Sequence, residues 1–215
     1  ENLHQILSSL TEVRVLDCQD PSVPDVTFVA NAGSFLLCST GYKFFPATFR
    51  HPERKKEEPF FIEQLGTCEV QRVYQVFEGD GDLLRLRDRI IVGYGHRTNL
   101  VAVNELASAC DADNDDMIAV QLCDQRFYHL DTCFFYHNND KNDFCMYYPG
   151  AFMPRSLALL RRVCVELNIN VLEVTEPEAE MMICNAVGVG DVIVAHDFSE
   201  RVRNWLYGQG FKTMT

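Results

Sequence analysis

Apolar residues recur along the chain at a helical spacing, and each such segment is followed by a short apolar run. The helical spacing covers residues 2–10, 59–65, 99–109, 154–167 and 199–207. The short runs cover residues 13–16, 69–76, 117–122, 170–174 and 211–214, and their length predicts strands. Thr98 or Asn99 and Ser199 suit N-cap positions. The pattern therefore predicts five helix-then-strand units.

After each of the first four units, a second apolar segment carries one polar residue. These residues are Asn31, Glu78, His129 and Asn185, and they follow one another at intervals of roughly fifty residues. A regular interval of this size indicates a repeat protein, either open or closed. We favour a closed ring, because an open array exposes apolar end faces, and a ring would gather the polar residues around one axis.

The third of these segments, residues 127–135, reads FYHLDTCFF and predicts a strand. His129 and Asp131 are two residues apart, so both side chains would leave the same face of that strand. A polar pair on an apolar strand needs partners when it is buried, and a pocket for a cationic group would supply them. The alternative is a half-exposed strand with a polar face.

An acidic turn precedes the predicted hairpin strands 83–86 and 89–93. Gly79 and Gly81 permit a tight turn, so Glu78 and Asp82 could both point inward. The turn lacks the lysine and hydroxyl of a phosphate-binding loop and the spacing of an EF-hand. A plain acidic hairpin turn is the alternative. A further hairpin turn, rather than a lid, is predicted at residues 138–143.

Three other polar residues stand near predicted element ends. Asn31 lies between small residues, which a simple turn also explains. Arg50 belongs to the charged segment 49–58, which we expect to be an exposed loop. Arg97 precedes a predicted helix and could be a surface residue or a ligand for a carboxylate.

Composition narrows the functional classes. The chain has 215 residues, 47% of them hydrophobic, which is enough for a substantial core. A formal net charge of −12 disfavours nucleic acid as a partner. No apolar window reaches the length of a membrane span, so we expect no membrane association. The nine cysteines are scattered singly, which indicates reduced thiols and a cytoplasmic protein.

Six segments, taken in order, resemble the guanidine-modifying pentein superfamily. They are residues 25–33, 49–54, 78–82, 93–98, 129–132 and 148–152. The likeness covers nearly the whole chain and is greatest to proteins of the dimethylarginine dimethylaminohydrolase type and to arginine dihydrolase domains. It implies an α/β fold, a five-bladed ββαβ propeller with pseudo-fivefold symmetry. Residues 1–215 would then be a single catalytic domain, with its first and last blades incomplete.

The resemblance also implies a mechanism. Members of the superfamily that hydrolyse guanidines use a cysteine thiolate, form a covalent thiouronium and need no metal or organic cofactor. His129 matches the histidine that protonates the leaving amine and then activates water. Glu78 and Asp131 match carboxylates that bind the guanidinium nitrogens.

The remaining matches concern substrate binding. Asn31 stands where arginine deiminases carry an aspartate. An asparagine at this position is the pattern of the dihydrolase-like branch. Arg50 and Arg97 match residues that bind the substrate's α-carboxylate. Asp82 lies in the acidic turn with Glu78 and belongs to the substrate-binding set, and we expect it to orient that loop.

The nucleophile has no match among the nine cysteines. In the family it lies near the C-terminus, so we expect it after Thr215, in a segment missing from this chain together with an N-terminal strand. Cys133 follows the histidine motif, but we expect it to be a packing residue. The chain alone should therefore bind a guanidine without turning it over.

These observations favour a hydrolase of linear amidines acting on L-arginine and giving citrulline, or ornithine after a second hydrolysis. Methylated arginine is the alternative substrate. A non-catalytic pentein that serves as a binding module is the alternative class. The expected partner is a small guanidino compound, and the sequence leaves a monomer and a homo-oligomer both open.

Overall fold

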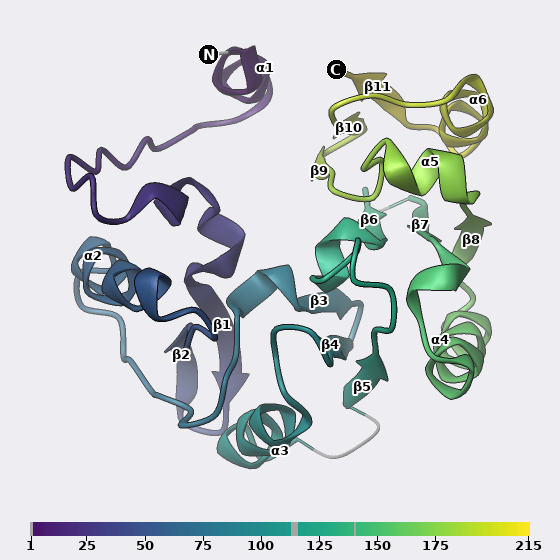
Figure 1. Ribbon diagram of the computed structural model, residues 1–215. Helices are drawn as coiled ribbons and strands as arrows, with labels where there is room; N and C mark the ends of the chain where they lie inside the picture. Colours follow the sequence, from purple (N-terminus) through teal and green to yellow (C-terminus); the bar gives the residue numbers. More distant parts are fainter. Residues whose placement is uncertain (1, 113–115, 140) are drawn as a thin grey trace. The chain divides into compact units, whose positions relative to one another are not determined.

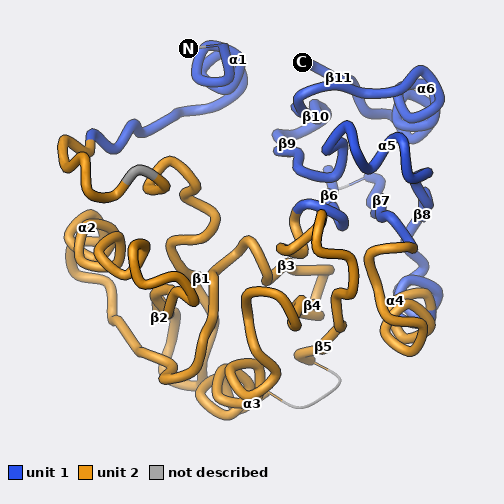
Figure 2. The backbone as a smooth tube through the Cα atoms, viewed as in Figure 1, with its two compact units in different colours: residues 1–17, 132–149, 162–215 blue, residues 18–131, 150–161 orange. Residues whose placement is uncertain are grey.

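The computed structural model describes residues 2–112, 116–139 and 141–215. The chain divides into two compact units, shown in Figure 2. Unit 1 comprises residues 1–17, 132–149 and 162–215, and unit 2 comprises residues 18–131 and 150–161. The candidate site residues 31, 50, 78, 82, 97, 129 and 131 all belong to unit 2.

Unit 2 contains two small sheets (Figure 1). In the first, β1 (Gly33–Cys38) pairs antiparallel with β2 (Gly41–Pro46), and α2 (Glu57–Gln64) follows. In the second, β3 (Leu83–Leu86) pairs antiparallel with β4 (Arg89–Tyr94). The chain then forms α3 (Leu100–Ala109) and returns as β5 (Met117–Gln121), parallel to β4.

Unit 1 also contains two small sheets. Strands β6 (Phe134–Asn138), β7 (Asp143–Tyr147) and β8 (Asn170–Glu173) form one, and β9 (Val187–Val189), β10 (Val192–Val194) and β11 (Lys212–Met214) form the other. Its helices are α1 (Asn2–Leu10), α5 (Glu176–Glu180) and α6 (Glu200–Gly208). Helix α4 (Pro154–Glu166) has residues in both units.

One motif recurs along the chain: a hairpin, a helix, and a strand parallel to the second hairpin strand. The complete motif occurs as β3-β4-α3-β5, as β6-β7-α4-β8 and as β9-β10-α6-β11. The five predicted helices are confirmed, with shifts of a few residues at their ends. Asn99 and Ser199 are the N-caps, accepting hydrogen bonds from the backbone nitrogens of Ala102 and Val202.

Two predicted strands are wrong. Residues 13–16 are not in a strand, and Val15 is 66% exposed. Residues 69–76 are not assigned to a strand, although Val70 forms an isolated bridge with Phe44. Apolar composition predicts which segments could be buried, but a strand also needs a partner of matching length.

The strand predicted at residues 127–135 is wrong over residues 127–133. His129 lies in a bend, Asp131 in a 3-10 helix (Leu130–Thr132), and β6 begins at Phe134. Asn31 likewise lies in a 3-10 helix (Val29–Ala32), and Glu78 directly precedes another (Gly79–Gly81). The predicted repeat is thus present in a different form, because each of these residues stands just before the first strand of a hairpin.

The hairpin turn at residues 138–143 is confirmed by the pairing of Asn138 with Asp143, although residue 140 lies outside the described residues. The side chain of Asn139 accepts hydrogen bonds from the backbone nitrogens of Lys141 and Asn142. These bonds close the turn locally, as an Asx turn does.

Each unit has its own apolar core. In unit 2, Ala102, Val103 and Leu106 of α3 pack into a cluster that includes Phe77 and Leu83. The N-terminus of α3 is therefore fixed beside the β3–β4 hairpin, which places residues 97 and 98 next to the acidic turn. In unit 1, the centroid of the Phe144 ring is 4.8 Å from that of Phe211 and 5.6 Å from that of Trp205, so β7 packs against α6 and the residue before β11.

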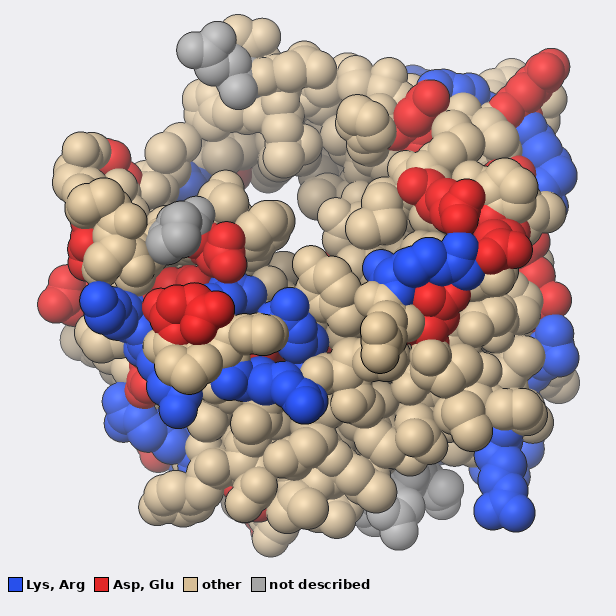
Figure 3. Space-filling model, in the orientation of Figure 1, with Lys and Arg blue, Asp and Glu red and all other residues tan. Residues whose placement is uncertain are grey.

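The surface carries charges of both signs. On the face shown in Figure 3, positive and negative side chains are interspersed over the region of α2, as expected of a solvated surface. No helix in the described part of the chain combines the length and the apolar character needed to cross a bilayer.

Candidate active site

A buried carboxylate and imidazole pair lies at the start of the β3–β4 hairpin. Atom Oε2 of Glu78 is 2.8 Å from Nε2 of His129, and their side chains are 0% and 6% exposed. The two residues are 51 positions apart in the sequence. Tertiary structure therefore brings together two of the polar residues that the repeat predicted would converge.

Both oxygens of Glu78 are engaged. Oε2 also accepts a hydrogen bond from Nη1 of Arg97 (3.1 Å), and Oε1 accepts one from the backbone nitrogen of Arg50 (3.1 Å). Burial by itself would raise the pKa of Glu78, but His129, the backbone of Arg50 and the Arg97 guanidinium together hold it below its usual value. Glu78 is therefore an ionised acceptor that faces cationic and N–H donors.

Asp82 is buried and joins two loops. Its Oδ1 accepts a hydrogen bond from the backbone nitrogen of Leu130 (3.0 Å), and its Oδ2 accepts one from that of Thr98 (3.1 Å). Burial raises the pKa of Asp82, although His129 and these hydrogen bonds oppose the rise. This bonding explains why residues 127–133 form no strand, because Leu130 donates to a carboxylate instead of to a neighbouring strand.

The two predicted carboxylate-binding arginines lie close to this pair. The Arg97 guanidinium stacks 4.5 Å from the centroid of the Tyr128 ring. Nη1 of Arg50 donates to the backbone oxygen of His96 (2.8 Å), next to Arg97 in the chain. Arg50 is exposed and Arg97 half-buried, so both guanidinium groups lie where solvent and a ligand could reach them.

Asn31 lies close to the Glu78–His129 pair because Gly79 and Gly81 leave room for the loop that carries it. Gly79 has a φ of +64°, and a Cβ there would lie 2.7 Å from the backbone oxygen of Ala30. A Cβ on Gly81 would lie 2.1 Å from Nδ2 of Asn31 and 3.6 Å from Cδ2 of His129. The loop bearing Asn31 therefore packs directly against the acidic turn, and the Asn31 amide and the His129 ring flank one glycine.

The exposed-loop prediction for residues 49–58 is wrong at Phe49, Arg54 and Glu57, which are buried, and residues 52–58 are helical instead of a loop. Nε and Nη2 of Arg54 each donate to one oxygen of Glu57 at 2.8 Å. Nη1 of Arg54 donates to Oδ1 of Asn31 at 3.2 Å. The sequence held one signal for this pair, its i,i+3 spacing at the start of a helix after Pro52.

Asp131 is half-buried in the 3-10 helix that follows His129. Its predicted contact with a guanidinium stays a prediction. The structure brings Asn31, Glu78, Asp82, Arg97 and His129 together in unit 2. Among the residues that sequence reasoning missed, Thr98 accepts a hydrogen bond from the Glu78 backbone nitrogen at its hydroxyl (3.1 Å).

Neither Cys133 nor Cys123 has the environment of a nucleophile. Cys133 is fully buried, which agrees with its predicted packing role. Cys123 is exposed, and burial of its sulfur together with Asp124 raises the pKa of its thiol. A raised pKa lowers the fraction of reactive thiolate. Among the described residues, no group of three or more histidine, cysteine or carboxylate side chains is arranged to hold a metal ion.

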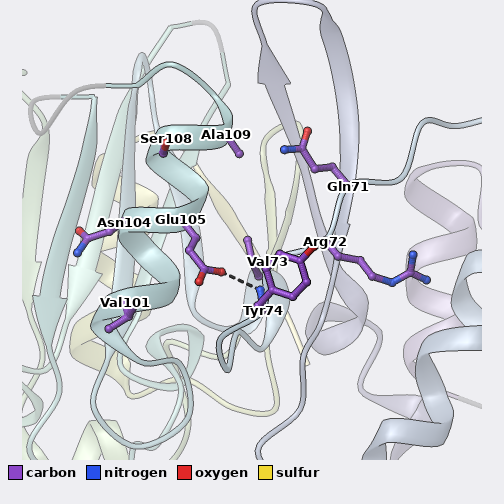
Figure 4. A pocket seen from close by; sticks show the side chains of 9 residues that line it. All are labelled: Gln71, Arg72, Val73, Tyr74, Val101, Asn104, Glu105, Ser108 and Ala109. Carbon is purple, nitrogen blue, oxygen red and sulfur yellow. Dashed lines mark hydrogen bonds between the residues drawn. The ribbon is translucent and has the colours of Figure 1, made fainter.

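A surface cleft of about 470 Å³ lies elsewhere in unit 2, between α3 and residues 71–74 (Figure 4). Glu105 on α3 points into it and accepts a hydrogen bond from the backbone nitrogen of Tyr74 (2.7 Å). None of the candidate site residues lines this cleft. It is therefore separate from the Glu78–His129 pair.

Residues 46–209 match the sequence profile of the arginine deiminase family. The chain belongs to this family. It is 34% identical over its full length to the bifunctional arginine dihydrolase/ornithine cyclodeaminase AgrE of Nostoc sp., and 34% identical over 99% of its length to ArgZ of Synechocystis sp.. The chain spans 29% of the length of each of these two relatives.

A third relative is the dimethylarginine dimethylaminohydrolase of Mycobacterium tuberculosis, which is 33% identical over 71% of this chain and 48% of its own length. The pentein resemblance inferred from the sequence motifs is thereby confirmed.

Solved structures of family members agree with this assignment. The N-terminal domain of ArgZ, in a cysteine-to-serine variant bound to its substrate, superposes with a TM-score of 0.87 at 31% identity, covering 99% of this chain and 76% of that one. A dimethylarginine dimethylaminohydrolase adduct superposes with a TM-score of 0.65 at 18% identity, covering 91% and 72%, and shows the fold alone. The chain therefore has the α/β pentein fold.

Proposed function

We propose that these 215 residues supply the guanidine-binding and proton-transferring groups of a hydrolase acting on L-arginine. The observation that carries the proposal is the buried Glu78–His129 pair at 2.8 Å, flanked by Arg97 and Asn31. The names of AgrE and ArgZ, both arginine dihydrolases, support arginine as the substrate.

Glu78 would bind the guanidinium by charge-assisted hydrogen bonds, with Asp131 as the second carboxylate. Nη1 of Arg97 donates a hydrogen bond to Oε2 of Glu78. A substrate guanidinium would take that position, and Arg97 would turn to the substrate's α-carboxylate together with Arg50. The substrate thus exchanges one cation at Glu78 for another, which avoids leaving a buried carboxylate unpaired.

His129 would transfer protons in both halves of the reaction. A thiolate attacks the guanidinium carbon, and the C–N bond breaks as His129 protonates the departing amine. The now neutral imidazole then takes a proton from water, which attacks the thiouronium and releases the ureido product. We propose that the thiolate comes from a cysteine after Thr215, as the family pattern predicts.

Two further parts of the proposal concern architecture and product. We propose that the recurring motifs of hairpin, helix and strand are blades of a five-bladed ββαβ propeller. The common order of their elements along the chain supports this proposal. A second hydrolysis would convert citrulline into ornithine, ammonia and carbon dioxide. Dimethylarginine is the second candidate substrate, favoured by the likeness to the Mycobacterium tuberculosis relative.

The test is an assay of the full-length protein with arginine and with dimethylarginine, measuring citrulline, ornithine and dimethylamine. We expect citrulline or ornithine from arginine, and loss of the product in the His129→Ala variant. Dimethylamine and citrulline from dimethylarginine, without product from arginine, would favour the second candidate. Absence of all three products in a folded full-length protein that carries a downstream cysteine would contradict the enzyme proposal.

A further inference from the structure

A buried ion pair lies directly behind Asn31. The forked guanidinium of Arg54 donates to both oxygens of Glu57, and the side chains of the two are 5% and 1% exposed. The Phe49 ring lies 4.4 Å from the guanidinium carbon, and the backbone oxygen of Asp25 accepts a further hydrogen bond from Nη2 (3.4 Å). Arg54 is therefore held from several sides in one orientation.

Stability alone does not account for this pair. Desolvating an arginine and a glutamate costs about as much as their attraction returns, so apolar residues of similar size often stabilise a fold equally well. In the nearby pair Arg72–Glu58 the arginine side chain is 58% exposed and the glutamate 29% exposed, so neither charge has to be fully desolvated. A buried pair in contact with a candidate site residue points to a positional role.

The contact determines which way the Asn31 amide faces. Arginine carries only N–H donors, so the Asn31 atom next to Nη1 of Arg54 must be the amide oxygen. The amide nitrogen then faces Gly81, beside His129. An amide without this contact could rotate by half a turn and present its oxygen instead, because the two ends have nearly the same shape.

We propose that Arg54, anchored by Glu57, is a positioning residue that locks the Asn31 amide with its N–H donors toward the His129 side of the site. The proposal rests on the proposed function. A guanidinium has no acceptor atoms, so an N–H donor adds little to binding of the substrate in its ground state. The Asn31 N–H group gains an acceptor only when attack on the guanidinium carbon leaves lone pairs on the substrate nitrogens. Because that hydrogen bond forms in the transition state, its loss should lower kcat more than it changes KM.

The test is a double-mutant cycle in the full-length protein with Arg54→Met, Asn31→Ala and the double variant. We expect Arg54→Met to lower kcat by roughly 10- to 100-fold while KM changes by less than about 3-fold. In the Asn31→Ala background, Arg54→Met should have no further effect on kcat. Arg54→Lys, which keeps the charge but lacks the fork, should give an intermediate kcat, and Arg72→Ala is the matched control, expected to stay within about 2-fold of wild type.

Several outcomes would overturn the proposal. It fails if the two single effects multiply in the double variant, or if Arg54→Met and Arg54→Lys both leave kcat unchanged. If Arg54→Met does not fold, the Arg54→Lys and Glu57→Gln variants give the same cycle with Asn31→Ala. Equal losses of kcat in the presence and absence of Asn31 would then show a structural role alone.

A second readout does not depend on turnover. The side-chain amide of Asn31 can be identified in ¹H–¹⁵N spectra by its loss in Asn31→Ala. We expect one slowly exchanging amide pair in wild type and in Arg72→Ala, and averaged or doubled signals in Arg54→Lys. An unchanged Asn31 signal in Arg54→Lys would contradict the inference even if the enzyme proposal held. An inactive wild-type protein whose Asn31 signal still changes in Arg54→Lys would contradict the proposed function alone.

Discussion

Glu78 and Glu178 are buried glutamates, one in each unit, and each binds an arginine, yet their other partners differ in kind. Glu178 accepts hydrogen bonds from Thr175, Ser199 and Arg201, and two of these residues are the N-caps of α5 and α6. The Arg201 guanidinium is the main cause that lowers the pKa of Glu178 to about 2. This carboxylate ties the starts of two helices together within unit 1.

Glu78 is bound instead by side chains and backbone of loops, and one partner is a histidine. Burial works against its ionisation, and the lowered pKa of Glu78 depends on neighbours that a ligand could displace. A buried carboxylate with fixed helix-cap partners, such as Glu178, stabilises a fold. A buried carboxylate that is bonded to a titratable imidazole and a half-buried arginine, such as Glu78, suits proton transfer.

The largest expected effect separates the two glutamates by activity. Glu78→Gln removes the negative charge that, in the proposed function, binds the substrate guanidinium and supports His129. We expect kcat/KM of the full-length protein for arginine to fall by about 10³-fold or more. In Glu178→Gln, kcat/KM measured below the unfolding temperature should change by less than about 3-fold. Comparable losses in both variants would contradict the functional distinction.

The converse experiment separates them by stability. Glu178→Ala leaves Arg201, Ser199 and the Thr175 cap without their acceptor, so we expect the free energy of unfolding to drop by about 2 kcal/mol. Glu78→Gln should cost less than about 1 kcal/mol, because active-site groups are seldom optimised for stability. Chemical denaturation followed by circular dichroism measures both, and a larger loss in Glu78→Gln would reverse the assignment.

A pair of glycines tests how closely the site in unit 2 is packed. The Cβ of Gly81→Ala would overlap the Asn31 amide, so we expect kcat/KM to fall roughly 10- to 100-fold. Gly208, at the end of α6 in unit 1, has no atom within 4 Å of the equivalent Cβ position. Gly208→Ala is the matched control and should leave activity and the unfolding midpoint nearly unchanged. Equal activity in the two variants would mean that Asn31 tolerates displacement.

The smallest effect concerns acid stability. A carboxyl whose folded pKa is lowered contributes stability above its unfolded pKa, near 4.5, and that contribution is lost as the pH falls toward the folded value of about 2. Between pH 6 and pH 3 the stability difference between wild type and Glu178→Gln should shrink by about 1 kcal/mol, after allowance for the solvent exposure of Arg201. Urea unfolding at several pH values measures it, and a constant difference would show that Glu178 does not titrate in this range.

Local pattern was sufficient for much of the fold. The helices and the hairpin strands 83–86 and 89–94 follow from side-chain periodicity and caps, which depend on residues a few positions apart. The segment 69–76 has the composition of a strand, yet its state depends on what lies beside it. Sequence motifs also identified Glu78, His129 and Asn31, since the approximate repeat and the family resemblance both single them out.

What the sequence determined by itself is therefore five of the helices, the hairpin of strands 83–86 and 89–93, the hairpin turn at residues 138–143, the family, and the polar residues before the hairpins. Only the tertiary structure decided how those residues are held. Leu130 donates to Asp82 across 48 positions, and residues 127–133 form a bend and a 3-10 helix instead of a strand. Arg54, assigned to an exposed loop, is buried against Asn31. The physical reason is that buried N–H groups must find acceptors, and when these come from distant side chains, local pattern cannot specify them.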